Sequence, residues 1–188
     1  MELYGSYTSP FVRHCRIALL ESGVSCVFVE TDATSSAKLS PTQKMPFLRY
    51  MEGGKEKMLT DSSAILKFIR EQSGKVFFSD NDDFNNYCTA STLLDTAINL
   101  FYLEKEDLTP AKSAYLTRQQ SRMASGLAEL NKLTFSKTAP FTDSELRIAC
   151  FLDWALFRNR ITLDAYLNLK TFLDNVRNYP HFASTAPK

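Results

Sequence analysis

Short apolar runs and helically spaced apolar stripes follow one another in the first part of the chain. Apolar residues from Phe11 to Leu19 repeat at helical spacing, and Gly23 ends the pattern. The flanking apolar runs predict strands, and Gly53-Gly54 predicts a hairpin turn. The expected strands cover about residues 1–6, 25–31, 46–51 and 56–59, and the expected helices about 10–22 and 62–74, with a short or irregular helix between 31 and 40. This order predicts a mixed four-stranded sheet with helices packed on it, an α/β domain.

From Phe84 onward the strand pattern disappears. Helices are predicted over about residues 84–104, from Thr109-Pro110 to about 133, from about 142, and over 163–176. Thr142 and Glu145 have the spacing of a capping box, and we interpret them as folding residues. The expected organisation is an α/β domain over residues 1–74, a polar linker over 75–83 and an all-α domain over 84–188.

Composition and charge exclude several classes of function. The chain of 188 residues is 44% hydrophobic, which is enough for a packed core, so disorder is not expected. A formal net charge of +1 gives no electrostatic basis for binding nucleic acid. No run of about 18 apolar residues and no secretion signal are present, so no membrane association is expected and a cytoplasmic location is predicted.

The cysteines and histidines do not form a metal motif. The four cysteines contain no CxxC pair and no cysteine–histidine spacing that suits zinc; they are Cys15, Cys26, Cys88 and Cys150. All but Cys88 lie in apolar surroundings, so we expect small buried hydrophobes rather than reactive thiols. With only His14, expected to be solvated, and His181, a histidine-based hydrolase or metal site is not expected.

Ser9-Pro10 is the first candidate for chemistry. A serine N-cap followed by proline at the first helical position is a well-formed helix start. It also places a hydroxyl donor where unpaired backbone N–H groups and the positive end of the helix dipole meet, an environment that stabilises a thiolate. Ser9 can therefore be a structural cap or a catalytic donor, and both roles need the same geometry.

Three segments together resemble the N-terminal thioredoxin-like domain of the cytosolic glutathione transferases. They are Tyr7–Arg13, with the sequence YTSPFVR, Ser40–Leu48, which contains Met45-Pro46, and Leu59–Leu66, which contains Asp61-Ser62-Ser63. The closing run Tyr179–Pro187 resembles the end of the helical domain of this family. The first motif is most similar to bacterial and tau-like members that use serine. The resemblance implies a thioredoxin-like domain followed by an all-α domain, and a homodimer.

The resemblance also implies roles for individual residues. Ser9 would donate a hydrogen bond to the thiolate of bound glutathione, while Ser62 would meet the γ-glutamyl carboxylate and Asp61 the ammonium group. Glutamate is commoner than aspartate at the position of Asp61 in the family. Met45-Pro46 would be cis, leaving the Met45 backbone free to pair with the peptide.

The remaining candidates have weaker support. Lys44 would meet the glycine carboxylate, although a solvated lysine explains it equally well. Tyr7 and Thr8 are reserve hydroxyls, Phe11 is an accessory wall residue, and Arg13 would tune the site or form a salt bridge between subunits. Phe101-Tyr102 is a second candidate wall, and a buried helix seam explains it as well.

Three hypotheses remain open at this stage. In the first, the protein is a glutathione transferase that activates the thiol of glutathione for attack on a small hydrophobic electrophile, without a metal. In the second, it is a glutathione-dependent thiol–disulfide or peroxide reductase, or a non-catalytic relative; Ser9 stands where a reductase of this kind has its nucleophilic cysteine. In the third, it is a purely structural or interaction module.

Overall fold

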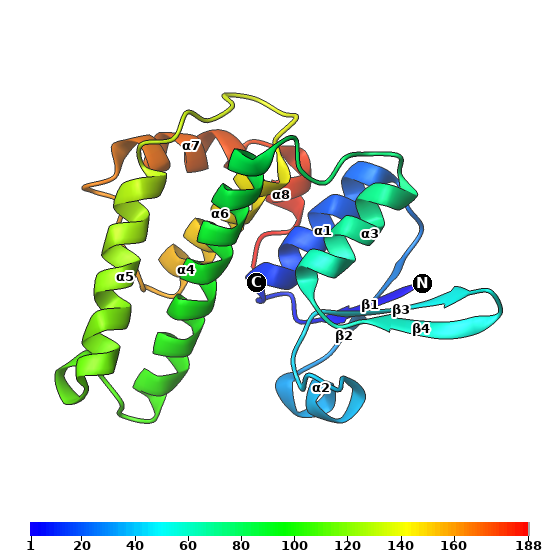
Figure 1. The fold of residues 1–188 in the computed structure, drawn as a ribbon, viewed down its shortest axis with the longest axis horizontal. Coiled ribbons are helices and arrows are strands. Elements are labelled where there is room, and N and C mark those ends of the chain that lie inside the picture. Colours follow the sequence, from blue (N-terminus) through cyan, green and yellow to red (C-terminus); the bar gives the residue numbers. More distant parts are fainter. Residues whose placement is uncertain (188) are drawn as a thin grey trace. The chain divides into compact units, whose positions relative to one another are not determined.

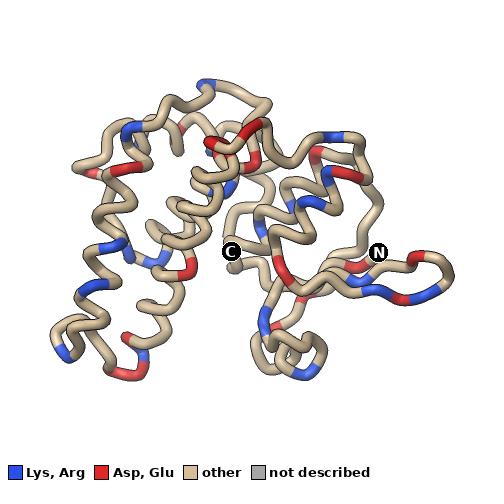
Figure 2. Tube along the Cα trace, in the orientation of Figure 1, with Lys and Arg blue, Asp and Glu red and all other residues tan. Residues whose placement is uncertain are grey.

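The computed structural model describes residues 1–187 as two compact units. The first contains residues 1–77 together with the tail from Pro180, and the second contains Phe78–Tyr179. The tail, which was predicted to belong to the helical domain, thus packs with the first unit. Lys/Arg and Asp/Glu residues are interspersed in both units, as the small net charge leads us to expect (Figure 2).

The first unit is built on one four-stranded sheet in the order β2-β1-β3-β4 (Figure 1). β1 pairs parallel with β2 and antiparallel with β3, and β3 pairs antiparallel with β4, which confirms the predicted mixed sheet. Helices α1 and α3 lie side by side on one face, and α2 lies on the other side of the sheet. The elements are β1 Glu2–Gly5, α1 Pro10–Ser22, β2 Val27–Glu30, α2 Ala33–Leu39, β3 Phe47–Glu52, β4 Lys55–Leu59, α3 Ser62–Gln72 and α8 Pro180–Ser184.

Local signals explain where α1 begins and ends. Ser9 is its N-cap and Pro10 is its first residue. Proline is tolerated at this position because the N–H of a first helical residue would have no acceptor within the helix. At the other end Gly23 has a φ of 64° and donates its N–H to the Leu19 carbonyl at 3.1 Å. Only glycine adopts this left-handed conformation without strain, so the helix stops here as predicted.

The packing of α1 on the sheet depends on Gly5 at the end of β1. A Cβ atom at Gly5 would lie 2.4 Å and 2.7 Å from the two γ-methyl carbons of Val12, which is fully buried. Glycine therefore allows the first turns of α1 to approach the strand this closely. The core around this contact consists of fully buried apolar side chains, among them Leu3, Ile17, Phe47, Leu48, Ile65, Leu66 and Ile69.

The tail is attached to the first unit through a buried arginine. Arg13 donates from Nη2 to the Phe182 carbonyl at 2.9 Å, and its guanidinium carbon lies 3.7 Å from the centre of the Phe182 ring. The Arg13 Nε group also donates to the Thr185 hydroxyl at 3.4 Å. These contacts explain why residues so distant in sequence join the first unit; α8, to which Phe182 belongs, was not predicted from the sequence.

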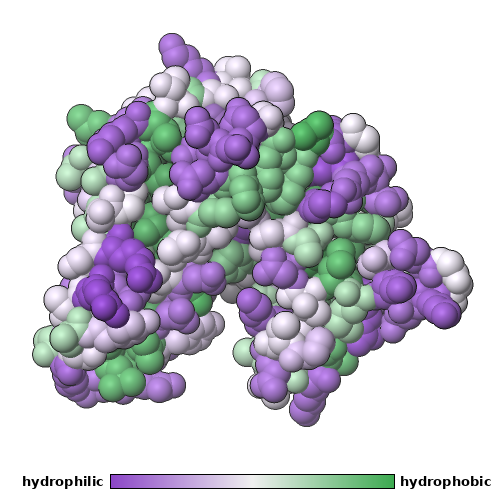
Figure 3. Space-filling model, viewed as in Figure 1, coloured by the Kyte–Doolittle hydropathy of each residue, from purple (hydrophilic) through white to green (hydrophobic). Residues whose placement is uncertain are grey.

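Among the residues described, the second unit contains helices and connecting loops but no strand, as predicted. Its elements are α4 Asn81–Lys105, the 3-10 turn η1 Pro110–Lys112, α5 Ala114–Leu130, α6 Asp143–Phe157 and α7 Leu167–Arg177. The predicted helix start at Thr109-Pro110 is wrong, since it begins only the short turn; Ser113 is extended and separates this turn from α5. Figure 3 shows hydrophobic surface at the lower end of this unit, and Leu108, which is 45% exposed, lies in the connection between α4 and α5.

The predicted capping box is present at the start of α6. The Glu145 N–H donates to the Thr142 hydroxyl, and the Thr142 N–H donates to the Glu145 carboxylate at 2.9 Å. The same carboxylate also accepts from the Ser136 N–H at 2.6 Å. These groups satisfy backbone donors of the start of α6 and of the preceding loop, so Glu145 and Thr142 act in folding.

Gly5→Ala is expected to lower the free energy of unfolding by about 1–3 kcal/mol, because the new methyl group would overlap the side chain of Val12. Urea denaturation measures the change. Val12→Ala, alone and combined with Gly5→Ala, completes a double-mutant cycle. We expect the double variant to lose less stability than the sum of the single variants; strict additivity would show that the contact does not limit the packing.

Candidate functional site

The pairing register brings three chain segments to one edge of the sheet. Tyr4, near the end of β1, pairs with Phe47 at the start of β3, and Leu48 pairs with Leu59 at the end of β4. The loop from β1 to α1, the residues that precede β3 and the turn from β4 into α3 therefore meet at this edge. These are the three segments that carried the family resemblance.

Direct contacts tie these segments together. The Ser6 N–H donates to the sulfur of Met45 at 3.2 Å, which joins the β1–α1 loop to the residues before β3. The buried Cys15 thiol of α1 donates to the Ser62 carbonyl at 3.8 Å, which joins α1 to the start of α3. The candidate residues thus lie on three mutually supported segments.

Ser9 lies half-buried at the N-cap of α1. Its hydroxyl oxygen accepts from the Val12 N–H at 3.4 Å, at the long end of hydrogen-bond distances. Among residues 1–187, the Ser9 hydroxyl donates no hydrogen bond to another group. A weakly held cap of this kind is able to turn its proton toward a ligand at the helix start.

The two reserve hydroxyls are held differently. Thr8 Oγ1 shares a hydrogen bond of 3.0 Å with Ser6 Oγ, within the loop itself. Tyr7 packs its ring against Phe28, with the ring centres 4.8 Å apart. Of the three hydroxyls, only that of Ser9 stands at the helix N-terminus.

Arg16, which was not among the predicted site residues, lies beside Tyr7. Its guanidinium carbon lies 4.6 Å from the centre of the Tyr7 ring and 5.3 Å from that of Phe28. Nη1 is buried without a hydrogen-bond partner among the described residues, and burial lowers the pKa of Arg16. The sequence spacing could have predicted this position. Arg16 follows Ser9 by seven residues, about two helical turns, and therefore lies on the same face of α1.

Other residues of α1 depart from their predicted surroundings. The expectation that His14 is solvated is wrong: it is fully buried. Val12 to Cys15 are all buried, and four consecutive residues cover a full turn, so α1 has no solvent face there. Phe11 is half-buried, as a wall residue could be. Arg13 is buried against the tail, so its role as a salt bridge between subunits stays a prediction without support from its contacts here.

The Met45-Pro46 peptide bond is cis, as expected from the resemblance. Met45 is half-buried and Pro46 is buried at the start of β3. Lys44 is exposed, which agrees both with a role in binding a carboxylate and with an ordinary solvated lysine.

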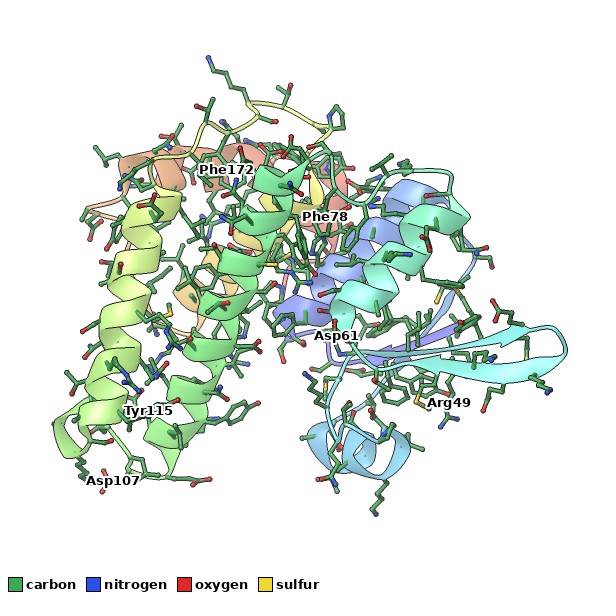
Figure 4. The ribbon with its side chains drawn as sticks, viewed as in Figure 1. Arg49, Asp61, Phe78, Asp107, Tyr115 and Phe172 are labelled. Atoms are coloured by element: carbon green, nitrogen blue, oxygen red, sulfur yellow. The ribbon has the colours of Figure 1, made fainter. Side chains whose placement is uncertain are left out.

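Asp61 and Ser62 form the N-terminus of α3 (Figure 4). Asp61 is exposed and is the N-cap, with its carboxylate accepting from the Ser63 N–H at 2.8 Å. Ser62, the first helical residue, is buried. The helix start can bind an anion through its N–H groups, and the exposed carboxylate can pair with a cation, so together they suit a zwitterionic group.

The described residues contain no group of three or more histidine, cysteine or acidic side chains that could hold a metal ion. Within the same part of the chain no helix is long and apolar enough to cross a membrane. The edge of the sheet offers hydrogen bonding and charge from two helix N-termini, one carboxylate and one lysine.

Comparison with known proteins identifies this arrangement. Residues 3–76 match the sequence model of the glutathione S-transferase N-terminal domain. A search of curated proteins finds no match. Among solved structures, a glutathione S-transferase of Methylobacterium radiotolerans in complex with glutathione sulfonate has 23% identity and a TM-score of 0.83, over 99% of this chain and 94% of that one.

Two further structures agree over whole chains. A glutathione S-transferase of Methylobacillus flagellatus with glutathione bound has 20% identity and a TM-score of 0.83, over 100% and 99% of the two chains. A glutathione transferase family member of Pseudomonas fluorescens with bound S-(propanoic acid)-glutathione has 22% identity and a TM-score of 0.80, again over 100% and 99%.

The first unit is thus a thioredoxin-like domain, and the chain as a whole has the fold of the glutathione transferases. Residues 3–76 carry the sequence pattern of the glutathione S-transferase N-terminal domain. The predicted fold is confirmed, and the N-terminal domain model of the predicted family matches residues 3–76. The finer prediction of a bacterial or tau-like serine type stays a prediction.

The environment of the four cysteines predicts how fast each thiol reacts. Cys88 is exposed, Cys15 and Cys150 are fully buried, and burial raises the pKa of Cys26. We expect the native protein to show one fast thiol, Cys88, when titrated with a chromogenic disulfide, and the buried thiols to react only after unfolding. Cys88→Ser should abolish the fast phase. A fast phase that survives this substitution would place a reactive thiol elsewhere and favour a reductase.

Proposed function

We propose that this protein binds glutathione at the edge of the sheet and activates its thiol for attack on a small electrophile. The observation that carries the proposal is the convergence of the Ser9 and Asp61-Ser62 helix starts with Met45-Pro46 at that edge. The glutathione-bound relatives with the same fold support it. A homodimer and a cytoplasmic location belong to the proposal as well.

Ser9 is proposed as the hydrogen-bond donor to the thiolate. When bound, glutathione would supply a thiol, and a free thiol with a pKa near 8.5 is only a few per cent ionised at pH 7. Lowering that pKa by about two units, worth roughly 2.7 kcal/mol, makes most of it nucleophilic. The Ser9 hydroxyl, the N–H groups at the start of α1 and the helix dipole can together supply this amount.

The start of α3 is proposed to hold the γ-glutamyl end of glutathione. Ser62 and the N–H groups behind it would face the carboxylate, and Asp61 would pair with the ammonium group. The Met45 backbone beside Pro46 would pair with the peptide, and Lys44 would meet the glycine carboxylate. Tyr7 and Phe11 are proposed as accessory residues around the thiol.

A thiol–disulfide reductase is the less favoured alternative, because no cysteine among the described residues of the first unit is exposed. Ser9 stands at the helix start, and Cys15 is fully buried with its thiol directed at the Ser62 carbonyl. A non-catalytic glutathione-binding protein is the other alternative. Calorimetry with glutathione, followed by a conjugation assay, separates binding from catalysis.

Ser9→Ala is expected to lower kcat/KM for conjugation by about one to two orders of magnitude, since a hydrogen bond to a charged group contributes about 1.5–3 kcal/mol. The affinity for glutathione measured by calorimetry should change little. Ser9→Thr is the matched control, because it keeps both the hydroxyl and the cap. An unchanged kcat/KM in Ser9→Ala would remove Ser9 from the mechanism and direct attention to Tyr7 or Thr8.

Substitutions of Asp61 separate its cap role from its proposed ligand role. Asparagine is as good an N-cap as aspartate, so Asp61→Asn should leave the free energy of unfolding nearly unchanged and still weaken glutathione binding by about tenfold, through loss of the charge. Asp61→Ala should lose both affinity and about 1 kcal/mol of stability. Full affinity in Asp61→Asn would mean that Asp61 only caps α3.

A further inference from the structure

Gln43 has a backbone conformation that glutamine rarely adopts. Its φ is 53°, in the left-handed region, where the Cβ atom of an L-residue comes too close to the following carbonyl oxygen. Two other non-glycine residues among those described have a positive φ, Asp107 and Asn159, and both are of the types that tolerate this region best. Gln43 is therefore the position of this kind that its own residue type does not explain.

The turn that precedes β3 holds Gln43 in this conformation. The Gln43 N–H donates to the Ser40 carbonyl at 2.9 Å, and the Ser40 and Thr42 hydroxyls share a hydrogen bond of 3.0 Å. Ser40 is itself buried, and its N–H donates to the Ser36 carbonyl at the end of α2. The chain thus leaves α2 in a well-bonded turn and changes direction at Gln43, directly before the residues proposed to bind the peptide.

The side chain of Gln43 does not stabilise this turn. It is exposed, and among residues 1–187 no hydrogen bond engages its amide group. Glycine would adopt the same φ without strain, so the glutamine side chain costs free energy that its contacts within the fold do not offset. Backbone strain of this kind, beside a candidate site, points to a role of the side chain in that site.

The order of the strands indicates which end of a bound peptide Gln43 would face. β3 lies between β1 and β4, and the start of α3, proposed to hold the γ-glutamyl end, follows β4. Gln43 instead arrives from α2, which follows β2 at the opposite edge of the sheet (Figure 1). A peptide that begins at α3 and pairs with Met45 therefore ends toward Lys44 and Gln43. Two residues span at most about 7 Å, so the Gln43 amide can reach the residue after the cysteine of that peptide.

We propose that Gln43 is a specificity-determining residue, which selects thiol peptides that continue beyond the cysteine. Its amide nitrogen would donate to the terminal carboxylate of the added residue, beside the Lys44 ammonium. This role rests on the proposed function and predicts which thiol the site prefers. Glutathione, with a glycine after the cysteine, would bind better than γ-glutamylcysteine, which ends at the cysteine.

Calorimetry of the full chain with glutathione and with γ-glutamylcysteine tests this role. Gln43→Gly should raise the Kd for glutathione about fivefold, through loss of a hydrogen bond to a charged group, and leave the Kd for γ-glutamylcysteine unchanged. Gln43→Glu keeps the size of the side chain and should raise the Kd for glutathione further, because two carboxylates would then face each other. An unchanged Kd for glutathione in Gln43→Gly, or an equal loss for both ligands, would overturn the proposal. A lack of glutathione binding by the unaltered chain would instead refute the proposed function, and this role with it.

Urea denaturation of the same variants tests the strain at Gln43. Glycine relieves strain in the folded chain but adds freedom to the unfolded chain, so we expect Gln43→Gly to keep or raise the urea midpoint. Asn159→Gly is the matched control, because it makes the same kind of change at an exposed residue of the second unit with a φ of 54°, and it should leave both Kd values unchanged. A lower midpoint in Gln43→Gly would show that the side chain supports the turn and would overturn the proposal.

Discussion

The close approach of Val12 to Gly5 determines where the candidate glutathione site lies. With no Cβ at Gly5, the first turns of α1 rest directly on the end of β1, and the N-terminus of the helix is held at the edge of the sheet. The register of β3 and β4 then brings the other two segments to the same edge. A larger residue at this position would displace the helix that carries Ser9, so the geometry of the site depends on a residue that takes no part in its chemistry.

The two helix starts at this edge differ in how strongly their caps are held. The Asp61 carboxylate accepts from its helix at 2.8 Å, whereas the Ser9 hydroxyl accepts at 3.4 Å. A ligand that binds Asp61 must share a carboxylate that already accepts a hydrogen bond from the Ser63 N–H. A ligand that binds Ser9 can accept the hydroxyl proton of Ser9, which is not used in capping the helix. The start of α3 therefore suits fixed recognition of a charged end group, and the start of α1 suits a reacting atom.

Elements with local signals could be predicted from the sequence, and those that depend on distant contacts could not. The cap Ser9-Pro10, the stop at Gly23 and the capping box of Thr142 gave the limits of α1 and the start of α6 closely. The burial of His14 depends on what covers α1 on every side, which no pattern within the helix reveals. For the same reason the tail could not be assigned to the first unit, because its attachment rests on Arg13, well over a hundred residues away.

Two arginines of α1 show how strongly the surroundings determine what one residue type does. Arg13 donates a hydrogen bond to the Phe182 carbonyl and stacks on the Phe182 ring, so it attaches the tail to α1. Arg16 stacks on Tyr7 with Nη1 unpartnered among the described residues, so its charge is not cancelled by a carboxylate at that contact. Because it lies on the face of α1 that begins at Ser9, this charge adds to the positive field of the helix start. Stabilisation of a thiolate there would then come from Ser9, the backbone and Arg16 together, and removing the hydroxyl alone would leave the electrostatic part in place.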